Sequence, residues 1–301
     1  RELADMEVNV ETGDSPKTTI STRGSIFNVI GMESKEFPPL PELEDRKSFA
    51  LDRNDLIKML KSVSYAQSVN EERYMLKGVF FQLNQGNLSL VATDGRRLAV
   101  TNSESKVSKE ENGEFILPSL TVSEIEKLPD VGDKIVVSFT DRQVEFELKV
   151  DDTQEEQIGF RNSVQLVSKV VEGKYPNYKQ VIPKDDFNFA EVERELMQEC
   201  VHRAALVSDE KVTLRIKSGE MEITGQSILG DACESMGIGY EGEDATVSFN
   251  PRFLLDPLRS ILQDKIKLEF RDDMSPGVFK VENEKNNELV FLCVVMPIRT
   301  D

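Results

Sequence analysis

Apolar residues recur at helical spacing in the stretch that follows Asp52. The residues at i, i+3, i+4 and i+7 there are Leu56, Met59, Leu60 and Val63. This spacing places them on one face of an α-helix, and the Asp52 carboxylate can accept hydrogen bonds from the first N–H groups of that helix. The pattern predicts a helix that buries this face and directs Lys58 and Lys61 elsewhere.

Beyond this helix the pattern changes to the alternation of apolar and polar residues that is typical of β-strands. Residues 78–83, 88–92 and 97–101 alternate in this way, with Asn/Gly and Asp-Gly turns between them. Because such turns close hairpins, the segments predict an antiparallel meander. A short amphipathic helix is predicted at 118–128, followed by strands at 134–139 and 143–150.

The same order of helix and strands returns after residue 170. A helix is predicted from about 190 to 205, and strands follow at 212–216 and 220–224. The residues expected on one face of this helix are Leu196, Cys200 and Ala204. We interpret the recurrence as a weak internal repeat.

A last helix begins at Asn250-Pro251, a capping residue followed by a proline that suits a first turn. Its apolar stripe comprises Leu254, Leu258, Ile261 and Leu262. Pro257 lies within the stretch, and a proline in a helix interior costs on the order of 3 kcal/mol. The helix is therefore expected to be short or kinked.

Residues 1 to about 45 hold two strand-like segments, at 4–10 and 25–30, and end in the proline-rich stretch 37–41. This piece is too small to have a core of its own. Since the chain starts at Arg1 just before an alternating segment, we expect further sequence upstream in the parent protein.

Composition narrows the class of protein. The 301 residues are 39% hydrophobic and 31% charged, which is typical of a soluble globular chain with two domains and part of another. No apolar run approaches the roughly 20 residues that span a membrane, and no signal segment is present, so we expect a cytoplasmic protein without a membrane partner. Three cysteines at unrelated spacings fit neither disulfides nor zinc, and we expect all three in the core: Cys200, Cys233 and Cys293.

The net charge of −18 argues against an ordinary nucleic-acid-binding surface, which carries a basic excess. A protein that encloses duplex DNA needs only a positive inner wall, and an acidic exterior limits stray contacts with DNA. Cations on or beside the predicted helices could form such a wall or merely a solvated face, and the second interpretation is the simpler one. These cations are Lys58, Lys61, Arg194, Arg252 and Arg259.

The residues give no support to catalysis. The stretch 237–242 has the spacing of a dinucleotide-binding loop, but a predicted strand at 245–249 follows where a helix is needed, so we interpret it as a turn. His202 is the only histidine, and Cys200 lies on another face of its helix. Acidic pairs are too common in this chain to indicate acid–base chemistry. We expect neither an enzyme nor a cofactor or metal.

Four separated segments carry a resemblance to a known family. They are Ala92-Thr93-Asp94-Gly95-Arg96-Arg97-Leu98, Glu172-Gly173-Lys174-Tyr175-Pro176-Asn177-Tyr178, Phe249-Asn250-Pro251-Arg252-Phe253-Leu254-Leu255 and Val294-Val295-Met296-Pro297-Ile298-Arg299. Alone, the first is a common hairpin signal and the last reads as an edge strand. Together, in this order and spacing, they resemble the bacterial DNA polymerase III beta sliding clamp over nearly the whole chain.

The resemblance implies an α+β fold of repeated clamp domains, each with two helices packed on antiparallel sheets. Residues 1–45 would finish a first domain whose helices are missing here, 46–170 would form the second domain and 171–301 the third. Two subunits of the family close head to tail around duplex DNA, without regard to its sequence. In that homodimer Phe27 and Val29 would belong to one contact surface, and Leu206 and Val207 to its counterpart.

The family also has a peptide-binding cleft between its second and third domains. It takes short linear motifs from the polymerase III catalytic subunit, the clamp loader, other polymerases and repair proteins. The resemblance implies a cleft wall of Leu76, Thr93, Gly95, Arg96, Arg97, Leu98, Pro176, Val181, Asn250, Phe253, Met274, Val294, Val295, Met296, Pro297, Ile298 and Arg299. Partner preference can differ here, because Gln180 stands where the family can place a basic residue and Thr300-Asp301 extend past the usual terminus.

On the DNA side, the resemblance places Asn70, Arg73 and Tyr74 near duplex that leaves the ring. The inner helices would carry Lys58, Lys61, Arg194, Arg252 and Arg259. The implied function is a non-enzymatic processivity factor. Two alternatives remain: an adaptor that binds peptides without encircling DNA, which the acidic charge permits, and a hydrolase with scattered carboxylates, which no nucleophile or metal constellation supports.

Overall fold

The computed structural model describes residues 7–13, 17–32, 34–41, 43–103, 106–107, 112–128, 132–149, 163–184, 187–228, 230–283 and 288–299. The chain forms two compact units, Arg1–Glu42 and Leu43–Asp301. The first unit contains one antiparallel sheet of β1 (Asn9–Thr12), β2 (Lys17–Ser21) and β3 (Ile26–Ile30). β3 confirms the strand predicted at 25–30. The strand predicted at 4–10 overlaps β1 only at Asn9 and Val10, and its residues 4–6 lie outside the described part. β2 was not predicted.

The second unit repeats one order of elements. Its first half contains β4 (Lys47–Asp52), α1 (Arg53–Val63), β5 (Gly78–Asn84), β6 (Asn87–Thr93), β7 (Arg97–Asn102), β8 (Gly113–Pro118), α2 (Ser119–Ile125), β9 (Lys134–Phe139), β10 (Gln143–Lys149) and β11 (Ser163–Lys169). Its second half contains β12 (Asn188–Glu193), α4 (Arg194–Ala205), β13 (Val212–Lys217), β14 (Glu220–Ser227), β15 (Gly230–Gly237), β16 (Ala245–Phe249), α5 (Pro251–Ser260), β17 (Lys265–Phe270), β18 (Gly277–Glu282) and β19 (Leu289–Val295). Within the described residues both halves run strand, helix, four strands, helix, three strands, which confirms the internal repeat.

The sheets repeat as well. The order β11-β10-β9-β4 in the first half corresponds to β19-β18-β17-β12 in the second, and β7-β6-β5-β8 corresponds to β15-β14-β13-β16. The halves are joined where β7 pairs antiparallel with β19, so that one eight-stranded sheet runs β12-β17-β18-β19-β7-β6-β5-β8. β19 is therefore an interior strand and not an edge strand.

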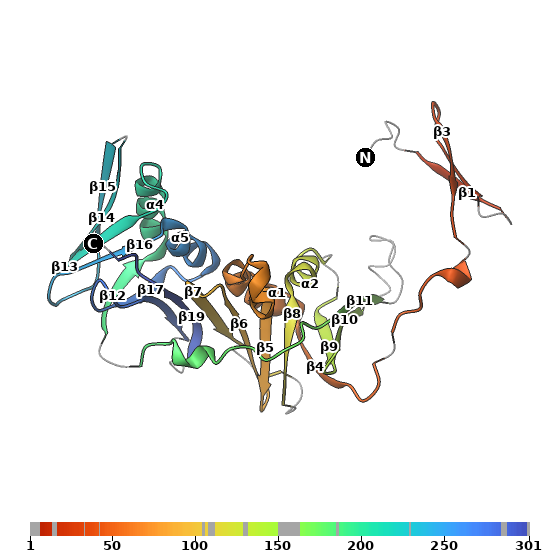
Figure 1. Ribbon diagram of the computed structural model, residues 1–301, viewed down its shortest axis with the longest axis horizontal. Helices are drawn as coiled ribbons and strands as arrows, with labels where there is room; N and C mark the ends of the chain where they lie inside the picture. Colours follow the sequence, from red (N-terminus) through yellow and green to blue (C-terminus); the bar gives the residue numbers. More distant parts are fainter. Residues whose placement is uncertain are drawn as a thin grey trace. The chain divides into compact units, whose positions relative to one another are not determined.

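Within the second unit, the helices lie along one side of the sheets (Figure 1). One core packs α1 and α2 on the first half and includes Leu60 and Phe81, and another packs α4 and α5 on the second half and includes Phe249. Because successive side chains of a strand point to opposite faces, the β7–β19 pair also supplies a third cluster, with Leu98 and Val294. This outer cluster lies on the face that the helices do not cover.

Helix α1 forms as predicted, and the reason is local. The Asp52 carboxylate accepts hydrogen bonds from the backbone N–H groups of Asn54 and Asp55, at 2.8 and 3.2 Å. The four residues of the predicted stripe, Leu56, Met59, Leu60 and Val63, are all buried.

The prediction for the third helix was wrong at its start. Residues 190–193 belong to β12 and not to α4, because they pair with β17. The predicted buried face was also wrong in part: Leu196 is 40% exposed, and Met197 and Val201 share the core with Cys200 and Ala204. Tertiary pairing has overridden a helical pattern here.

Two smaller expectations need correction. α5 is short, as expected from Pro257, but it ends at Ser260, and Leu262 is 69% exposed instead of buried. Cys200 and Cys293 are buried, whereas Cys233 is exposed on β15; all three are free thiols. The turn at 238–244 leads into β16 as predicted.

Candidate functional site

The turn before β7 is built by Asp94 and Gly95. The Asp94 carboxylate accepts hydrogen bonds from the backbone N–H groups of Arg96 and Arg97, at 2.9 and 3.0 Å. Gly95 has a φ of 86°, in the region that favours glycine, and a Cβ at this position would collide with the Arg73 guanidinium. The turn therefore needs glycine for its conformation, whereas the exposed Arg73 side chain could move away from a Cβ.

The Arg97 side chain links the two halves of the second unit. Its guanidinium donates to the carboxylates of Asp94, at 3.2 Å, and Asp256 of α5, and to the carbonyl oxygen of Tyr65, at 2.6 Å. The rings of Tyr65 and Phe253 lie 5.2 and 4.6 Å from its Cζ. With only 11% of the side chain exposed, Arg97 acts mainly as a connection between the Asp94 turn and α5.

The outer cluster forms an apolar floor on the opposite face of the sheet. Phe80 stacks on Tyr175 with ring centroids 4.7 Å apart, and Tyr178 meets Phe80 edge-on at 6.4 Å. The predicted cleft residues Leu76, Leu98 and Val294 are buried in this cluster. Three predicted cleft residues that adjoin its strands and loops remain about half exposed: Val181, Met274 and Met296. They offer apolar surface that a bound segment could cover.

Backbone hydrogen bonds hold the last residues beside this floor. Met296 N–H donates to the Arg96 carbonyl at 2.9 Å, and Ile298 N–H donates to the Ser248 carbonyl at 2.8 Å. The side chain of Asn250 caps α5 by accepting from Arg252 N–H at 3.0 Å. The first, third and last of the four resemblance segments therefore meet at one place.

The other predicted cleft residues divide between two faces. Val295 is fully buried in the core on the helix side, as Arg97 nearly is, so neither side chain lines the outer floor. Among the others, Pro176, Arg96 and Arg299 are exposed and Thr93, Phe253 and Pro297 are partly exposed. Thr300 and Asp301 lie outside the described residues.

The predicted DNA-facing cations also differ among themselves. Lys58 and Lys61 on α1, and Arg252 and Arg259 on α5, are exposed, as are Asn70, Arg73 and Tyr74 before β5. Arg194 is only 13% exposed, and its guanidinium donates to the carbonyls of Leu258 and Gln263. Arg194 thus fastens α4 to the end of α5 and presents little free charge.

Comparisons with known proteins decide the family. Two family models match the chain: the central domain of the DNA polymerase III beta subunit over residues 50–177, and its C-terminal domain over residues 179–299. The chain belongs to the DNA polymerase III beta subunit family. Its function is accordingly that of a DNA sliding clamp, a non-catalytic processivity factor.

Relatives of the beta subunit family match almost the whole chain. The beta sliding clamps of Chlamydia muridarum and Halalkalibacterium halodurans are 28% and 29% identical to it, over 99% and 100% of this chain and 78% and 77% of theirs. The sliding clamp structure from Bacillus subtilis has a TM-score of 0.84 at 25% identity, and covers 100% of this chain and 77% of that one. A sliding clamp from Pseudomonas aeruginosa bound to griselimycin has the same fold, with a TM-score of 0.83 at 23% identity over 97% of this chain and 76% of that one.

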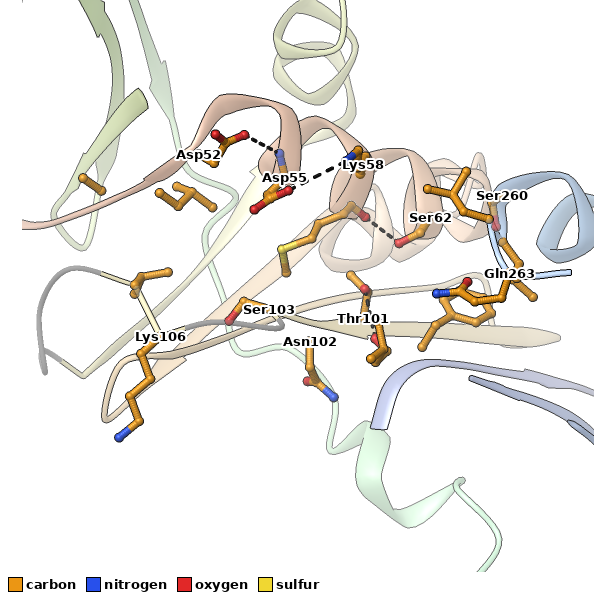
Figure 2. Close-up of a pocket in the computed structure, with 18 of the residues that line it drawn as sticks. Asp52, Asp55, Lys58, Ser62, Thr101, Asn102, Ser103, Lys106, Ser260 and Gln263 are labelled. Atoms are coloured by element: carbon orange, nitrogen blue, oxygen red, sulfur yellow. Dashed lines mark hydrogen bonds and ion pairs between the residues drawn. The ribbon is translucent and has the colours of Figure 1, made fainter. Parts of the chain in front are cut away.

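A crevice of about 590 Å³ lies on the helix side, between the two matched domains of the beta subunit family (Figure 2). Asp55, Lys58 and Ser62 of α1 lie on one side, Thr101, Asn102 and Ser103 lie across from them, and Ser260 and Gln263 lie at one end, beside Ser62 (Figure 2). The Thr101 hydroxyl and Asn102 amide donate to backbone carbonyls, at 3.1 and 2.9 Å. Since carboxylates and lysines are mixed around the crevice, its charge favours no class of ligand.

Catalytic or metal chemistry finds no support among the residues that the structure describes. His202 is exposed on α4, as expected. Among the described residues, no three His, Cys, Asp or Glu side chains lie close enough together to bind a metal ion. No described helix has the length and apolar character needed to cross a membrane.

Sequence reasoning missed the partners of Arg97 and the aromatic residues of the outer cluster. Tyr65 and Asp256 lie 32 and 159 residues from Arg97, and no local pattern connects them. Tyr175 and Tyr178 lie in a segment that carried the resemblance, but no role was assigned to either. The sequence signal that could have indicated a packing role is the spacing of these two aromatic residues, three apart with a proline between them.

The pH dependence of stability can test whether Cys293, on β19 where it pairs with β7, is buried. Burial raises the pKa of its thiol to about 12. In the unfolded chain the thiol loses its proton above its usual pKa near 8.5, whereas in the folded protein it stays protonated up to a higher pH. The contribution of this thiol to the free energy of unfolding is therefore constant below pH 8.5 and falls by roughly 1.4 kcal/mol per pH unit above it. We expect the free energy of unfolding to fall less steeply from pH 8 to 10 in Cys293→Ala than in the unsubstituted protein.

Urea unfolding at the two pH values measures this difference. The matched control is Cys233→Ala, which removes an exposed thiol and should follow the unsubstituted protein. An equal loss of stability in all three proteins would mean that Cys293 does not titrate as a buried group.

Proposed function

We propose that this sliding clamp works as a ring-shaped homodimer that encircles duplex DNA and holds its partners through peptides bound on the outer cluster. The observation that supports the proposal is the pairing of β7 with β19, which joins the two halves in one sheet and contributes Leu98 and Val294 to an apolar floor. The expected partners are the polymerase III catalytic subunit, the clamp loader, and other polymerases and repair proteins. Since a clamp works where the chromosome is, we place the protein in the cytoplasm.

The repeat supports closure by a second copy. In the second half, β15 holds the place of β7, and in the described chain it is an edge strand. β3 is also an edge strand and ends a three-stranded meander, as β19 does. Pairing of β3 with β15 of a second copy would repeat the β7–β19 joint, and two such contacts would close a dimer.

Exposed apolar residues accompany these edges. On β3, Phe27 and Val29 are 51% and 49% exposed, and Leu206 at the end of α4 is 75% exposed. Val207 beside it is partly buried. A contact between copies would remove this surface from water, which agrees with the dimer residues that the family resemblance implies.

Enclosure would explain how an acidic protein stays on DNA. Exposed cations on α1 and α5 can exchange with counterions along the phosphates, so contacts remain weak and independent of sequence while the ring prevents dissociation. The test is to load the protein on nicked circular DNA with a clamp loader and then cut the circle. Release on linearisation is expected, and equal retention on circular and linear DNA would contradict enclosure.

Charge reversal separates the clamp from a peptide adaptor. We expect Lys58→Glu with Arg259→Glu to reduce retention on the circle and to leave peptide binding intact, since both residues are exposed on helices away from the outer cluster. If DNA retention is unchanged by the two substitutions, the cationic face has no part in DNA binding and the adaptor is favoured.

Met296→Ala tests the peptide site. Met296 is 47% exposed beside the outer cluster, and its flexible side chain can adapt to Leu or Phe anchors. We expect the substitution to weaken binding of a Gln-Leu-x-Leu-Phe peptide by roughly 1–2 kcal/mol, measured by calorimetry. Leu120→Ala, an exposed apolar residue on α2, is the control and should leave the affinity unchanged. Unchanged affinity in Met296→Ala would remove this residue from the site.

A further inference from the structure

A hollow of about 670 Å³ lies at the β12 end of the eight-stranded sheet. It is bordered by the start of β12, by the turn between β13 and β14, and by residues 238–241. The last of these belong to the glycine-rich stretch 237–242, to which the sequence assigned no role beyond a turn. We call this place the edge hollow. It shares no lining residue with the predicted cleft or with the outer cluster.

Backbone pairing along this edge of β12 stops after a single pair. Glu191 and Gly239 exchange two hydrogen bonds, at 3.0 and 2.8 Å. Continuing this register would match Phe189 with Glu241, but no such pair forms. Because alternate residues of a strand direct their backbone groups to the same side, the N–H and C=O of Phe189 face the free edge as those of Glu191 do. Within the described part of the chain, neither group of Phe189 has a hydrogen-bond partner.

The gap is held open by the anchoring of Tyr240. Its carbonyl accepts from Gly219 N–H at 2.9 Å, and its hydroxyl donates to the Glu243 carbonyl at 2.8 Å. Its ring packs edge-on against Phe270, with the ring centroids 5.2 Å apart. These contacts direct the chain toward the β13–β14 turn and away from Phe189. A strand that binds here would therefore meet a preformed edge, which lowers the entropic cost of binding.

Apolar side chains flank the unpaired edge. Phe189 is 57% exposed, and Phe187 and Ile238 are partly buried in the same hollow. An edge strand with exposed apolar side chains is a template for pairing with another chain. An added strand would cover these side chains and would also form backbone hydrogen bonds with Phe189.

The charge around the edge hollow is negative. The described lining contains one charged side chain, that of Glu241, and Glu243 and Asp244 follow directly. All three are exposed, and none forms an ion pair with a cation among the described residues. Burial raises the pKa of the Tyr240 hydroxyl, and the carboxylates of Glu243 and Asp244 raise it further. This charge repels nucleic acid and favours a partner with Lys or Arg.

We propose that the edge hollow binds an extended segment of a partner protein, which adds a strand to β12 and carries Lys or Arg next to an apolar residue. The backbone of the segment pairs with Phe189. Its apolar side chain covers the exposed rings of Phe187 and Phe189, and its cation lies against Glu241.

This site is separate from the peptide site of the proposed function and does not depend on it. The residues that follow one another in register from β12 to β19 are Phe189, Glu269, Val278 and Val294. Three strand spacings of about 4.8 Å place Phe189 roughly 14 Å from Val294 of the outer cluster. A second partner can therefore dock at β12 while a peptide occupies the outer cluster.

The test uses an array of acetylated and amidated hexapeptides. Valine alternates in them with every combination of lysine, arginine, glutamine and threonine, and binding is measured by fluorescence anisotropy at low salt. Members with lysine or arginine should bind. Glu241→Gln should weaken them roughly three- to fivefold, an effect that shrinks as salt is added. Phe189→Ala should weaken them on the order of fivefold.

Matched controls make the same changes outside the edge hollow. Glu210→Gln neutralises an exposed carboxylate at the other end of β13, and Leu120→Ala truncates an exposed apolar residue on α2. Both should bind the array as the unsubstituted protein does. If no array peptide binds, or if the controls weaken binding as much as Glu241→Gln and Phe189→Ala do, the inference is overturned.

Backbone methylation distinguishes strand addition from attraction between opposite charges. A series of the tightest array peptide carries one N-methyl group at each successive residue. Because only alternate residues of an added strand face β12, methylation should weaken binding at every second position. Equal effects at all positions, or none, would mean that no strand is added.

Two further measurements identify the occupant and the site. Binding of the array peptide should be unchanged when Gln-Leu-x-Leu-Phe saturates the protein, and displacement would overturn a separate site. Failure of Gln-Leu-x-Leu-Phe itself to bind would contradict the proposed function and leave this inference standing. Sedimentation of the protein alone should be the same with and without Phe189→Ala. A smaller particle in the variant would assign the edge hollow to a second copy of this chain and overturn the inference.

Discussion

Replacing Arg97 by alanine is expected to lower the free energy of unfolding by about 3 kcal/mol, which is typical of removing one partner from a largely buried ion pair. The Arg97 side chain is 11% exposed, and the carboxylates of Asp94 and Asp256 are 19% and 28% exposed. Without the guanidinium these two carboxylates and the Tyr65 carbonyl would lose a shared donor. Urea unfolding at neutral pH measures the loss.

Two further variants make the Arg97 result specific. Arg97→Lys keeps the charge but not the planar fork that reaches three acceptors, so it should recover only part of the stability. Arg203→Ala removes an exposed arginine that pairs with Glu199 and Glu234, and should cost much less. If Arg97→Ala unfolds like Arg203→Ala, the connection between the turn and α5 contributes little.

Arg97→Ala should also weaken the Gln-Leu-x-Leu-Phe peptide by roughly 1–2 kcal/mol, but through position and not through contact. The side chain points to the helix side, while the outer cluster lies on the opposite face of the sheet. Calorimetry well below the unfolding temperature separates this effect from loss of the fold. Unchanged peptide affinity would show that the turn keeps its shape without Arg97.

Phe80→Ala is expected to destabilise the protein by about 3–5 kcal/mol, because it removes the centre of the outer cluster. Phe80 is 6% exposed and touches both Tyr175 and Tyr178. Its loss leaves a cavity under the segment that carries those tyrosines, so peptide affinity should fall as well. Chemical denaturation and calorimetry on the same variant measure both effects.

A matched phenylalanine controls for the change in hydrophobicity. Phe189 on β12 is 57% exposed, and Phe189→Ala should change stability little and peptide affinity not at all. Loss of stability without loss of peptide affinity in Phe80→Ala would mean that the outer cluster supports the fold but is not the floor of the peptide site.

Local pattern was sufficient where one face of an element is buried and its ends are marked. Helix α1 has both a regular stripe and an Asp52 cap, and β5 to β7 alternate between turn residues, so these elements were predicted closely. α4 shows the limit of this reasoning. Its first predicted residues join β12, because pairing with β17 outweighs their local preference.

The site was predictable in part, for a different reason. The four segments that carry the family resemblance identified the Asp94 turn and the end of β19, which the structure brings together. The partners of Arg97 and the packing of Tyr175 on Phe80 depend on contacts between residues far apart in the chain. Nothing in a short sequence window encodes such contacts.

The doubled order of elements has a consequence for how copies can assemble. In the proposed assembly a contact of β3 with β15 would join two different surfaces, so an open chain of copies would still end in one unpaired β3 and one unpaired β15 until these two meet. Whether such growth stops at two copies would then depend on the angle that each β3–β15 contact sets between neighbouring copies. A substitution that alters this angle without weakening the joint should turn a closed particle into an open fibre, which light scattering would detect as growth with concentration.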